Sequence, residues 1–145
     1  MRIFGILILL SILGLGLGLS YSMYRQLGTA VVSLNAAPEY VQNEAGNLCA
    51  DVDLSVKARS LGRWPLLLED GQNFAGVATV QGGATSDIGL RIISPTNRVV
   101  VFTPQRQHEY EFAVTSAIRG EYTFELDNRH STFTGKQVTI SVCLT

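Results

Sequence analysis

The 145-residue sequence contains few of the residue types that build catalytic or metal sites. It has two histidines, His108 and His130, and two cysteines, Cys49 and Cys143. Two cysteines without nearby histidines make a poor zinc site. No Gly-x-Ser-x-Gly element is present, and His130 and Ser131, as neighbours on an extended chain, would point to opposite faces. The sequence therefore predicts no catalytic residue, no metal site, no cofactor and no enzymatic activity.

Clustered positive charge is also scarce. Eleven Lys and Arg stand against twelve Asp and Glu, and the basic residues are scattered singly. A nucleic-acid-binding surface requires a basic patch or stripe, so we do not expect nucleic acid as a partner. Two carboxylate pairs, Asp51 with Asp53 and Glu109 with Glu111, lack the aromatic cleft of a glycosidase and the oxygen-rich loop of a calcium site. We interpret them as solvated strand faces.

One long hydrophobic run opens the chain. Residues Ile3 to Tyr24 carry no charge. As a helix they would extend about 33 Å, and a bilayer's hydrocarbon core is about 30 Å thick. Arg2 in front of the run favours export of the chain on its C-terminal side. We expect residues 1–25 to form an N-terminal hydrophobic helix that acts as a signal-anchor; the alternative is a signal peptide whose cleavage would give a secreted protein.

Two pairs of residues suggest further covalent or helix-helix contacts. The spacing Gly14-x-x-x-Gly18 would allow two helices of the anchor to approach closely and form a homodimer. The alternative is that the alternating Gly-Leu pattern produces this spacing without a role in association. Cys49 and Cys143 are expected to form a disulfide, because an exported protein with an even number of cysteines tends to pair them. Free buried thiols are the alternative.

The rest of the chain reads as all-β. We expect residues 26–48 to be a stalk, although residues 29–34 have the composition of a strand. From Cys49 onward, apolar residues alternate with polar ones, which is typical of half-buried strands separated by Gly and Pro turns. About eight short strands are predicted in residues 49–145, arranged as an antiparallel, jelly-roll-like β-sandwich. They lie near Cys49–Arg59, Trp64–Leu68, Gly76–Val80, Ile88–Ile93, Arg98–Thr103, Glu109–Thr115, Glu121–Leu126 and Gln137–Leu144.

The last quarter of the chain carries the most specific motif. It reads Gly-x-Tyr, then Asn-x-x-Ser-x-Phe, then Lys-x-Val, and an Asp-Ile strand with a Pro-containing turn precedes it. From about Pro65 to Leu144 the chain resembles the GOLD domain of the emp24/gp25L/p24 family, a β-sandwich of the secretory pathway. The resemblance implies a non-catalytic binding module. Its motif residues here are Asp87, Gly120, Tyr122, Asn128, Ser131, Phe133, Lys136 and Val138.

The motif residues are most simply structural. Gly120 fits a turn that needs a positive φ, and Tyr122 is expected in the core. Asn128 is expected to close a turn by bonding its own backbone, and Ser131 to hold the same loop. Lys136 is expected to cover a carboxylate or the sheet edge. We therefore interpret these residues as defining the fold rather than as a binding site.

The chain also departs from the family pattern. The p24 proteins typically have a cysteine in the strand after Gly-x-Tyr, paired with one in the opening strand, and here Glu125 stands at the first place. The family continues into a coiled coil, a transmembrane helix and a sorting tail, whereas this sequence stops at Thr145, so we do not expect recruitment of a sorting coat. Our hypothesis is a membrane-tethered extracytoplasmic domain that binds protein or lipid partners on the lumenal, periplasmic or extracellular side. The alternative is a secreted or surface carbohydrate-binding, prepeptidase-like β-sandwich.

Overall fold

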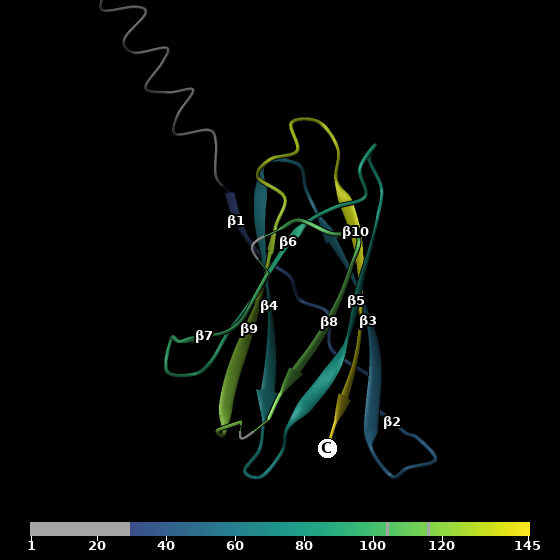
Figure 1. The fold of residues 1–145 in the computed structure, drawn as a ribbon, viewed down its shortest axis with the longest axis vertical. Helices are drawn as coiled ribbons and strands as arrows, with labels where there is room; N and C mark the ends of the chain where they lie inside the picture. Colours follow the sequence, from purple (N-terminus) through teal and green to yellow (C-terminus); the bar gives the residue numbers. More distant parts are fainter. Residues whose placement is uncertain (1–29, 104, 116) are drawn as a thin grey trace, which may run out of the picture.

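The computed structural model describes residues 30–103, 105–115 and 117–145. This part of the chain contains ten strands arranged in two layers (Figure 1). The strands are β1 (Ala30–Ser33), β2 (Val41–Gln42), β3 (Leu48–Val56), β4 (Ser60–Leu68), β5 (Phe74–Gln81), β6 (Gly89–Ile93), β7 (Val99–Phe102), β8 (Glu109–Val114), β9 (Gly120–Asp127) and β10 (Lys136–Leu144).

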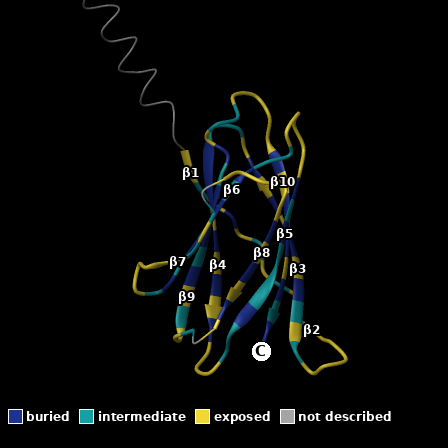
Figure 2. Cartoon of the chain, in the orientation of Figure 1, coloured by how far each residue is buried: buried dark blue, intermediate teal, exposed yellow. Residues whose placement is uncertain are grey.

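Two five-stranded sheets pack against each other. Sheet A has the order β1-β4-β9-β6-β7, and sheet B has the order β2-β3-β10-β5-β8. Along β3 and β8, side chains alternate between the buried interior and the surface, as the period of a strand requires. Figure 2 shows this alternation of buried and exposed positions. The all-β sandwich predicted from the sequence is confirmed.

Aromatic rings from both sheets fill the centre of the core. Trp64 of β4 packs edge-to-face on Phe124 of β9 with ring centroids 5.2 Å apart. Phe112 of β8 packs on the same Phe124 at 5.3 Å, and Phe74 of β5 packs on Tyr122 at 5.2 Å. Such contacts contribute beyond the burial of apolar area. The contacts of Phe112 with Phe124 and of Phe74 with Tyr122 join the two sheets.

The segment expected to be a stalk contributes two strands instead. β1 pairs with β4 in parallel, so the sandwich is not purely antiparallel, and β2 pairs with β3. After β1, the Leu34 side chain is buried beside Gly62, where an added Cβ would lie 2.8 Å from Leu34 Cδ1. The indole nitrogen of Trp64 donates to the Ala36 carbonyl at 2.8 Å. These contacts between distant residues bind the segment to the domain.

The N-terminal helix and its signal-anchor role were predicted for residues 1–25, which lie outside the described residues. The same holds for Gly14 and Gly18, so their part in a homodimer stays a prediction. In the part of the chain that the structure describes, no helix has the length and apolar character needed to cross a membrane.

Candidate functional site

The outer face of sheet A carries a row of ion pairs across three adjacent strands. Register places Arg63 of β4 and Arg91 of β6 on either side of Glu125 of β9. Arg63 Nε donates to Glu125 Oε1 at 2.9 Å, and Arg91 Nε donates to Oε2 at 2.7 Å. A terminal nitrogen of each guanidinium also contacts the same carboxylate. Sheet geometry therefore builds a three-residue network that local sequence does not reveal.

Glu125 is covered by the two arginines although it points out of the core. Its side chain is only 2 % exposed, whereas both arginines remain largely open to solvent. A carboxylate with this little solvent contact requires charged donors on both of its oxygens. The two guanidiniums satisfy that requirement, and their remaining N–H groups face outward. The row is thus a rigid cationic surface held in place by one carboxylate.

An open groove of about 900 Å³ lies beside this row. Its floor includes Gly89, which has no side chain, and its wall on the β7 side is formed by Phe102. The other lining residues are mostly charged or polar and include Arg91, Arg106, Arg129, Asp87, Glu125 and Asp127. The mixture of guanidiniums and one aromatic ring suits a charged polypeptide better than a small apolar molecule.

Asp87 gathers charged and polar partners at one end of the groove. It accepts a hydrogen bond from the Thr85 hydroxyl, and its carboxylate lies 3.4 Å from His130 Nε2, 3.5 Å from Arg106 Nε and 3.6 Å from Lys136 Nζ. The bond from Thr85 is the main cause of a lowered pKa of Asp87. His130 and Lys136 lower the pKa further, and partial burial opposes them.

Lys136 is a buried cation of β10 that contacts the loop between β5 and β6. Its side chain is 2 % exposed, and Nζ donates to the Gly82 carbonyl at 2.9 Å besides facing Asp87. Two motif residues that are 49 positions apart in sequence, Asp87 and Lys136, therefore meet in space. A buried ammonium requires such partners. The pair anchors the Gly82–Asp87 loop at the end of the groove.

Three further motif residues serve the fold. Gly120 has a φ of 133°, and an added Cβ would lie 2.8 Å from Pro95 Cγ, so this position requires glycine. The hydroxyl of buried Tyr122 accepts a hydrogen bond from the Ile118 backbone N–H at 3.0 Å. The Ser131 hydroxyl donates to the Thr134 carbonyl at 2.8 Å within its own loop.

Asn128 acts differently from the expected turn. Its side-chain amide, which is buried, donates to the backbone carbonyls of Val56, Lys57 and Thr134 at 3.0–3.3 Å. The side chain therefore joins the β9–β10 loop to the end of β3 instead of bonding its own backbone. The difference arises because the ends of β3 and β9 are brought together by the packing of the two sheets.

Phe133, another motif residue, lies outside the core, whereas the motif residue Val138 is fully buried. Its side chain is 92 % exposed in the loop between β9 and β10. An aromatic ring with that exposure contributes nothing to the core, so its role lies outside the sandwich interior.

β7 forms an apolar edge of sheet A. It pairs with β6 on one side and ends the strand order on the other, and Figure 1 shows it standing out from the body of the sandwich. Val99 and Val100 are exposed, and Phe102 is 65 % exposed. An exposed apolar edge strand offers free backbone N–H and C=O groups to another chain.

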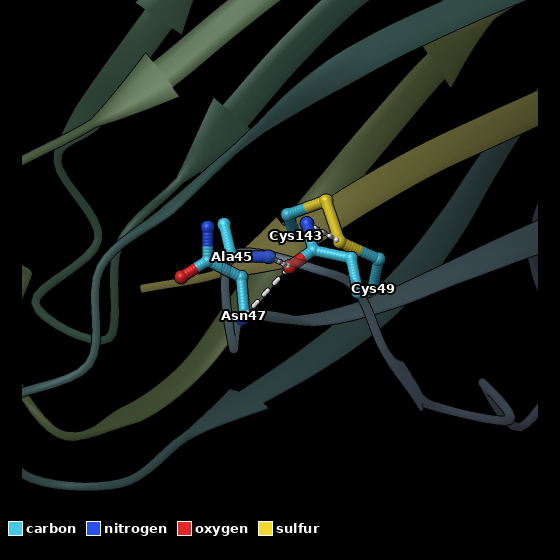
Figure 3. The surroundings of a disulfide bond; sticks show 5 residues. Ala45, Asn47, Cys49 and Cys143 are labelled. Atoms are coloured by element: carbon cyan, nitrogen blue, oxygen red, sulfur yellow. Dashed lines mark hydrogen bonds between the residues drawn. A yellow bond between two sulfur atoms is a disulfide. The ribbon is translucent and has the colours of Figure 1, made fainter.

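The predicted disulfide is present on sheet B. Cys49 of β3 and Cys143 of β10 are directly opposite each other, with Cα atoms 4.0 Å apart. Figure 3 shows the bond beside the loop of residues 43–47. In that loop the Ala45 and Asn47 backbone N–H groups donate to the Asn43 side-chain oxygen at 3.0 and 2.9 Å. The bond closes a separation of 94 residues.

The histidine and carboxylates considered from the sequence occupy separate places in the structure. His130 faces Asp87 in the salt-linked cluster at the end of the groove. Across the described residues, no group of three or more His, Cys, Asp and Glu side chains is arranged to hold a metal ion. The exposed Asp51 and Asp53 alternate with buried residues along β3, and Thr139 Oγ1 donates to Asp53 at 2.6 Å.

Comparison with known proteins identifies the domain. The family model described as emp24/gp25L/p24 family/GOLD matches residues 67–144, more than half of the chain. The chain belongs to the emp24/gp25L/p24 (GOLD) family. The match confirms the resemblance that the motifs indicated. It places β5 to β10 and the whole Asp87 cluster inside the GOLD domain, whereas β1, β2, β3 and most of β4 precede the matched region.

Other comparisons add little to this assignment. No curated protein sequence shows significant similarity to this GOLD-family chain. A similar solved structure is PliG of Aeromonas hydrophila, described as a periplasmic inhibitor of g-type lysozyme. It shares 13 % identity, with 81 % of this chain and 97 % of that chain covered and a TM-score of 0.46. Likeness at this level supports no inference about this chain.

Sequence reasoning missed the arginine partners of Glu125. It identified Glu125 only as the residue that replaces a family cysteine. Arg63 and Arg91 are 62 and 34 residues away, and only the pairing of β9 with β4 and β6 brings them beside it. The available signal was the charge of Glu125 between the core residues Phe124 and Leu126, because such a carboxylate needs cationic partners on neighbouring strands.

Proposed function

We propose that this chain is a membrane-tethered, extracytoplasmic and non-catalytic interaction domain, which binds an extended segment of a protein partner along β7 and the adjoining groove of sheet A. The observation that carries the proposal is the exposed apolar edge of β7, a short strand whose pairing with β6 contains one register shift. Natural sheets usually protect an edge with charged side chains, proline or a covering loop. Here three of the four β7 side chains are exposed valine or phenylalanine.

The mode of binding is set by that edge. An added strand would gain main-chain hydrogen bonds from β7, and its side chains would alternate between the groove and the opposite face. Phe102 stands opposite Arg91 on β6, so both side chains flank the groove on the outer face. An apolar side chain of the partner would pack on Phe102 at this position.

The charges around β7 define the partner further. Arg98 immediately precedes the strand, and Arg106 follows it at the end of the groove. Arg91 adds a third guanidinium from the neighbouring strand. The partner segment would therefore have apolar residues flanked by carboxylates, because arginine forms directed paired hydrogen bonds with carboxylates. A second copy of this chain fits less well. If two β7 strands paired antiparallel, Arg98 of each copy would lie near Arg106 of the other, and the like charges would repel.

The compartment and the tether are supported by separate observations. A disulfide such as Cys49–Cys143 persists in oxidising compartments outside the cytoplasm. Members of the emp24 family are membrane-associated in the secretory pathway. The uncharged run from Ile3 to Tyr24 is long enough to span a bilayer. Together these observations favour a retained anchor with the GOLD domain on the extracytoplasmic side.

A non-catalytic role agrees with the family, which is in general not enzymatic. The alternative of a carbohydrate-binding module would need aromatic rings exposed as a stacking platform. Trp64 is fully buried in the core with 0 % exposure, and Phe102 and Phe133 lie in separate elements. The protein-binding hypothesis is therefore the better supported of the two.

Site-directed photocrosslinking tests the proposal in membranes that contain the full chain. A benzoylphenylalanine at Val100 is expected to crosslink a protein partner, whereas the same group at Leu67, an exposed apolar residue on β4, is not. Introducing Phe102→Lys into the Val100 reporter should abolish the adduct, because a charge on the edge opposes strand addition. Leu67→Lys is the matched control. Equal adducts from Val100 and Leu67, or an adduct unaffected by Phe102→Lys, would refute β7 as the binding edge.

A further inference from the structure

The Phe133 loop and the start of the described chain lie at the same end of the sandwich. Ala30 of β1 pairs with Ser60 of β4, and the Ser60 carbonyl accepts a hydrogen bond from the Asn128 backbone N–H at 3.0 Å. The Arg59 backbone N–H donates to the Ser131 carbonyl, also at 3.0 Å. Figure 1 shows the β9–β10 loop and the start of β1 at one end.

The chain length limits how far this end is from the end of the hydrophobic run. Six residue steps join Tyr24, the last residue of the uncharged run, to Ala30. Even fully extended, they reach about 22 Å. A bilayer's interfacial layer on each side is itself roughly 5–8 Å thick. If the run spans the membrane, Ala30 and the loop beside it are therefore held near the bilayer surface.

Phe133 has the chemistry of a residue that enters a lipid interface. It is 92 % exposed at the loop, between Thr132 and Thr134, which are also exposed. Apolar and aromatic side chains bind at the boundary between headgroups and acyl chains. The exposed Lys57 lies at this end and supplies a positive charge near the loop, whereas the Arg129 guanidinium is already paired with Asp127 at 2.6 Å.

Hydrogen bonds from Asn128 and Ser131 hold the backbone of the loop that carries Phe133. The Asn128 side chain bonds three backbone carbonyls, of which one, Thr134, is in the same loop. The Ser131 hydroxyl bonds Thr134 as well. These bonds hold the loop backbone in one shape, so inserting the ring would cost little additional ordering of the chain.

We infer that the end of the sandwich formed by the β9–β10 loop rests on the bilayer, with the Phe133 ring inserted into the lipid interface beside the anchor. The inference rests on the tether proposed above. It gives the domain a fixed orientation relative to the bilayer. Phe133, which serves no purpose in the core, becomes the second membrane contact of the protein.

Spin labelling of the full chain in phosphatidylcholine vesicles tests this orientation. A nitroxide on Thr132→Cys, which leaves Phe133 in place, should be accessible to oxygen and shielded from a water-soluble nickel reagent. A nitroxide on Asp70→Cys is the control, because Asp70 is highly exposed in the turn after β4, at the other end of that strand from Ser60. That label should be open to the nickel reagent. Cys49 and Cys143 are bonded to each other and do not take the label.

The outcomes separate this inference from the proposed tether. Flotation with the vesicles after alkaline carbonate washing, together with a shielded label at position 132, would support both. Flotation with equal nickel accessibility at positions 132 and 70 would refute the membrane contact of Phe133 and leave the tether intact. A chain that fails to float would overturn both. Phe133→Ser, carrying a label at Thr132→Cys, should restore nickel accessibility if the ring holds the loop in the interface.

Discussion

The outer faces of the two sheets are fastened in different ways. On sheet B, the outward positions of β3 and β8 carry exposed carboxylates, and a covalent bond between Cys49 and Cys143 joins β3 to β10. On sheet A, the outward position of β9 holds Glu125, which is buried beneath two arginines, one from β4 and one from β6. On sheet B a disulfide joins two strands beneath a solvated acidic face. On sheet A ion pairs join three strands.

This difference matters because of where the family places its own cysteines. The resemblance predicts a cysteine in the strand after Gly-x-Tyr, paired with one in the opening strand, which corresponds to β9 and β4 of sheet A. This chain has Glu125 and Arg63 across those two strands, and its disulfide lies in sheet B. An ion-paired row leaves guanidinium donors at the surface, which a disulfide does not. Glu125, at the place where the resemblance predicts a cysteine, therefore also lines the groove.

The largest loss of stability is expected from removing the disulfide of sheet B. Replacing Cys49 and Cys143 together by Ala should lower the free energy of unfolding by about 4–5 kcal/mol in the chain-entropy model, because the bond closes a very long loop. Urea denaturation followed by the fluorescence of Trp64 measures the change. A loss below about 1 kcal/mol would show that the pairing of β3 with β10 already provides the closure.

A smaller loss of stability is expected from removing the ion pairs on sheet A. Glu125→Ala leaves Arg63 and Arg91 facing each other without their shared carboxylate. We expect a loss of about 3 kcal/mol, at the low end for buried pairs, since both guanidiniums still reach solvent. The matched control on sheet B is Glu111→Ala, an exposed outward carboxylate on β8, which should change stability by no more than about 0.5 kcal/mol. Equal losses in the two variants would remove the contrast between the faces.

Acid titration sharpens the comparison at the end of the groove. The pKa of Asp87 is held below its ordinary value of 3.8, chiefly by the Thr85 hydroxyl. A carboxyl with a lowered pKa stabilises the folded state fully at pH values above the ordinary value, and this stabilisation is lost as the pH falls through the folded-state pKa. Asp87→Asn should therefore destabilise the protein at pH 6, with a difference from the wild type that shrinks below about pH 4.

Denaturation at a series of pH values measures this difference. Thr85→Val removes the main cause of the lowered pKa, so it should reproduce part of the same pH dependence. A constant gap between the wild type and Asp87→Asn from pH 6 to pH 3 would contradict the assignment.

The sequence predicted the strands that alternate strictly and missed those whose placement depends on distant partners. The eight predicted strands all overlap observed ones, because residues such as Val52 and Leu54 repeat with a period of two along β3. β1 is short and its side chains are mostly exposed. Residues 29–34 have the composition of a strand, but the place of β1 in sheet A depends on contacts with distant residues, namely its pairing with β4, Leu34 beside Gly62, and Trp64 with Ala36.

The candidate site divides in the same way. Asp87 and Lys136 were identified through the family motif, although the motif did not say that they meet. The Glu125 row could not be predicted, because it needs the register of β9 with two strands that are remote in sequence. The groove and the exposed β7 edge are likewise products of strand order. Their role as a binding surface stays a proposal that the crosslinking experiment tests.

The smallest effect is expected from neutralising the acidic face of sheet B. Glu109→Gln with Glu111→Gln removes two exposed carboxylates from β8, an edge strand like β7. If partners bind at β7, the adduct from Val100 should keep its yield in this double variant, and stability should change by no more than about 0.5 kcal/mol. The matched change on the other edge is Arg98→Gln with Arg106→Gln, which should lower the adduct yield because it removes the guanidiniums at both ends of β7. A fall in yield from the β8 variant instead would mean that the partner contacts sheet B. The acidic face of sheet B, rather than the ion-paired face of sheet A, would then be the binding surface.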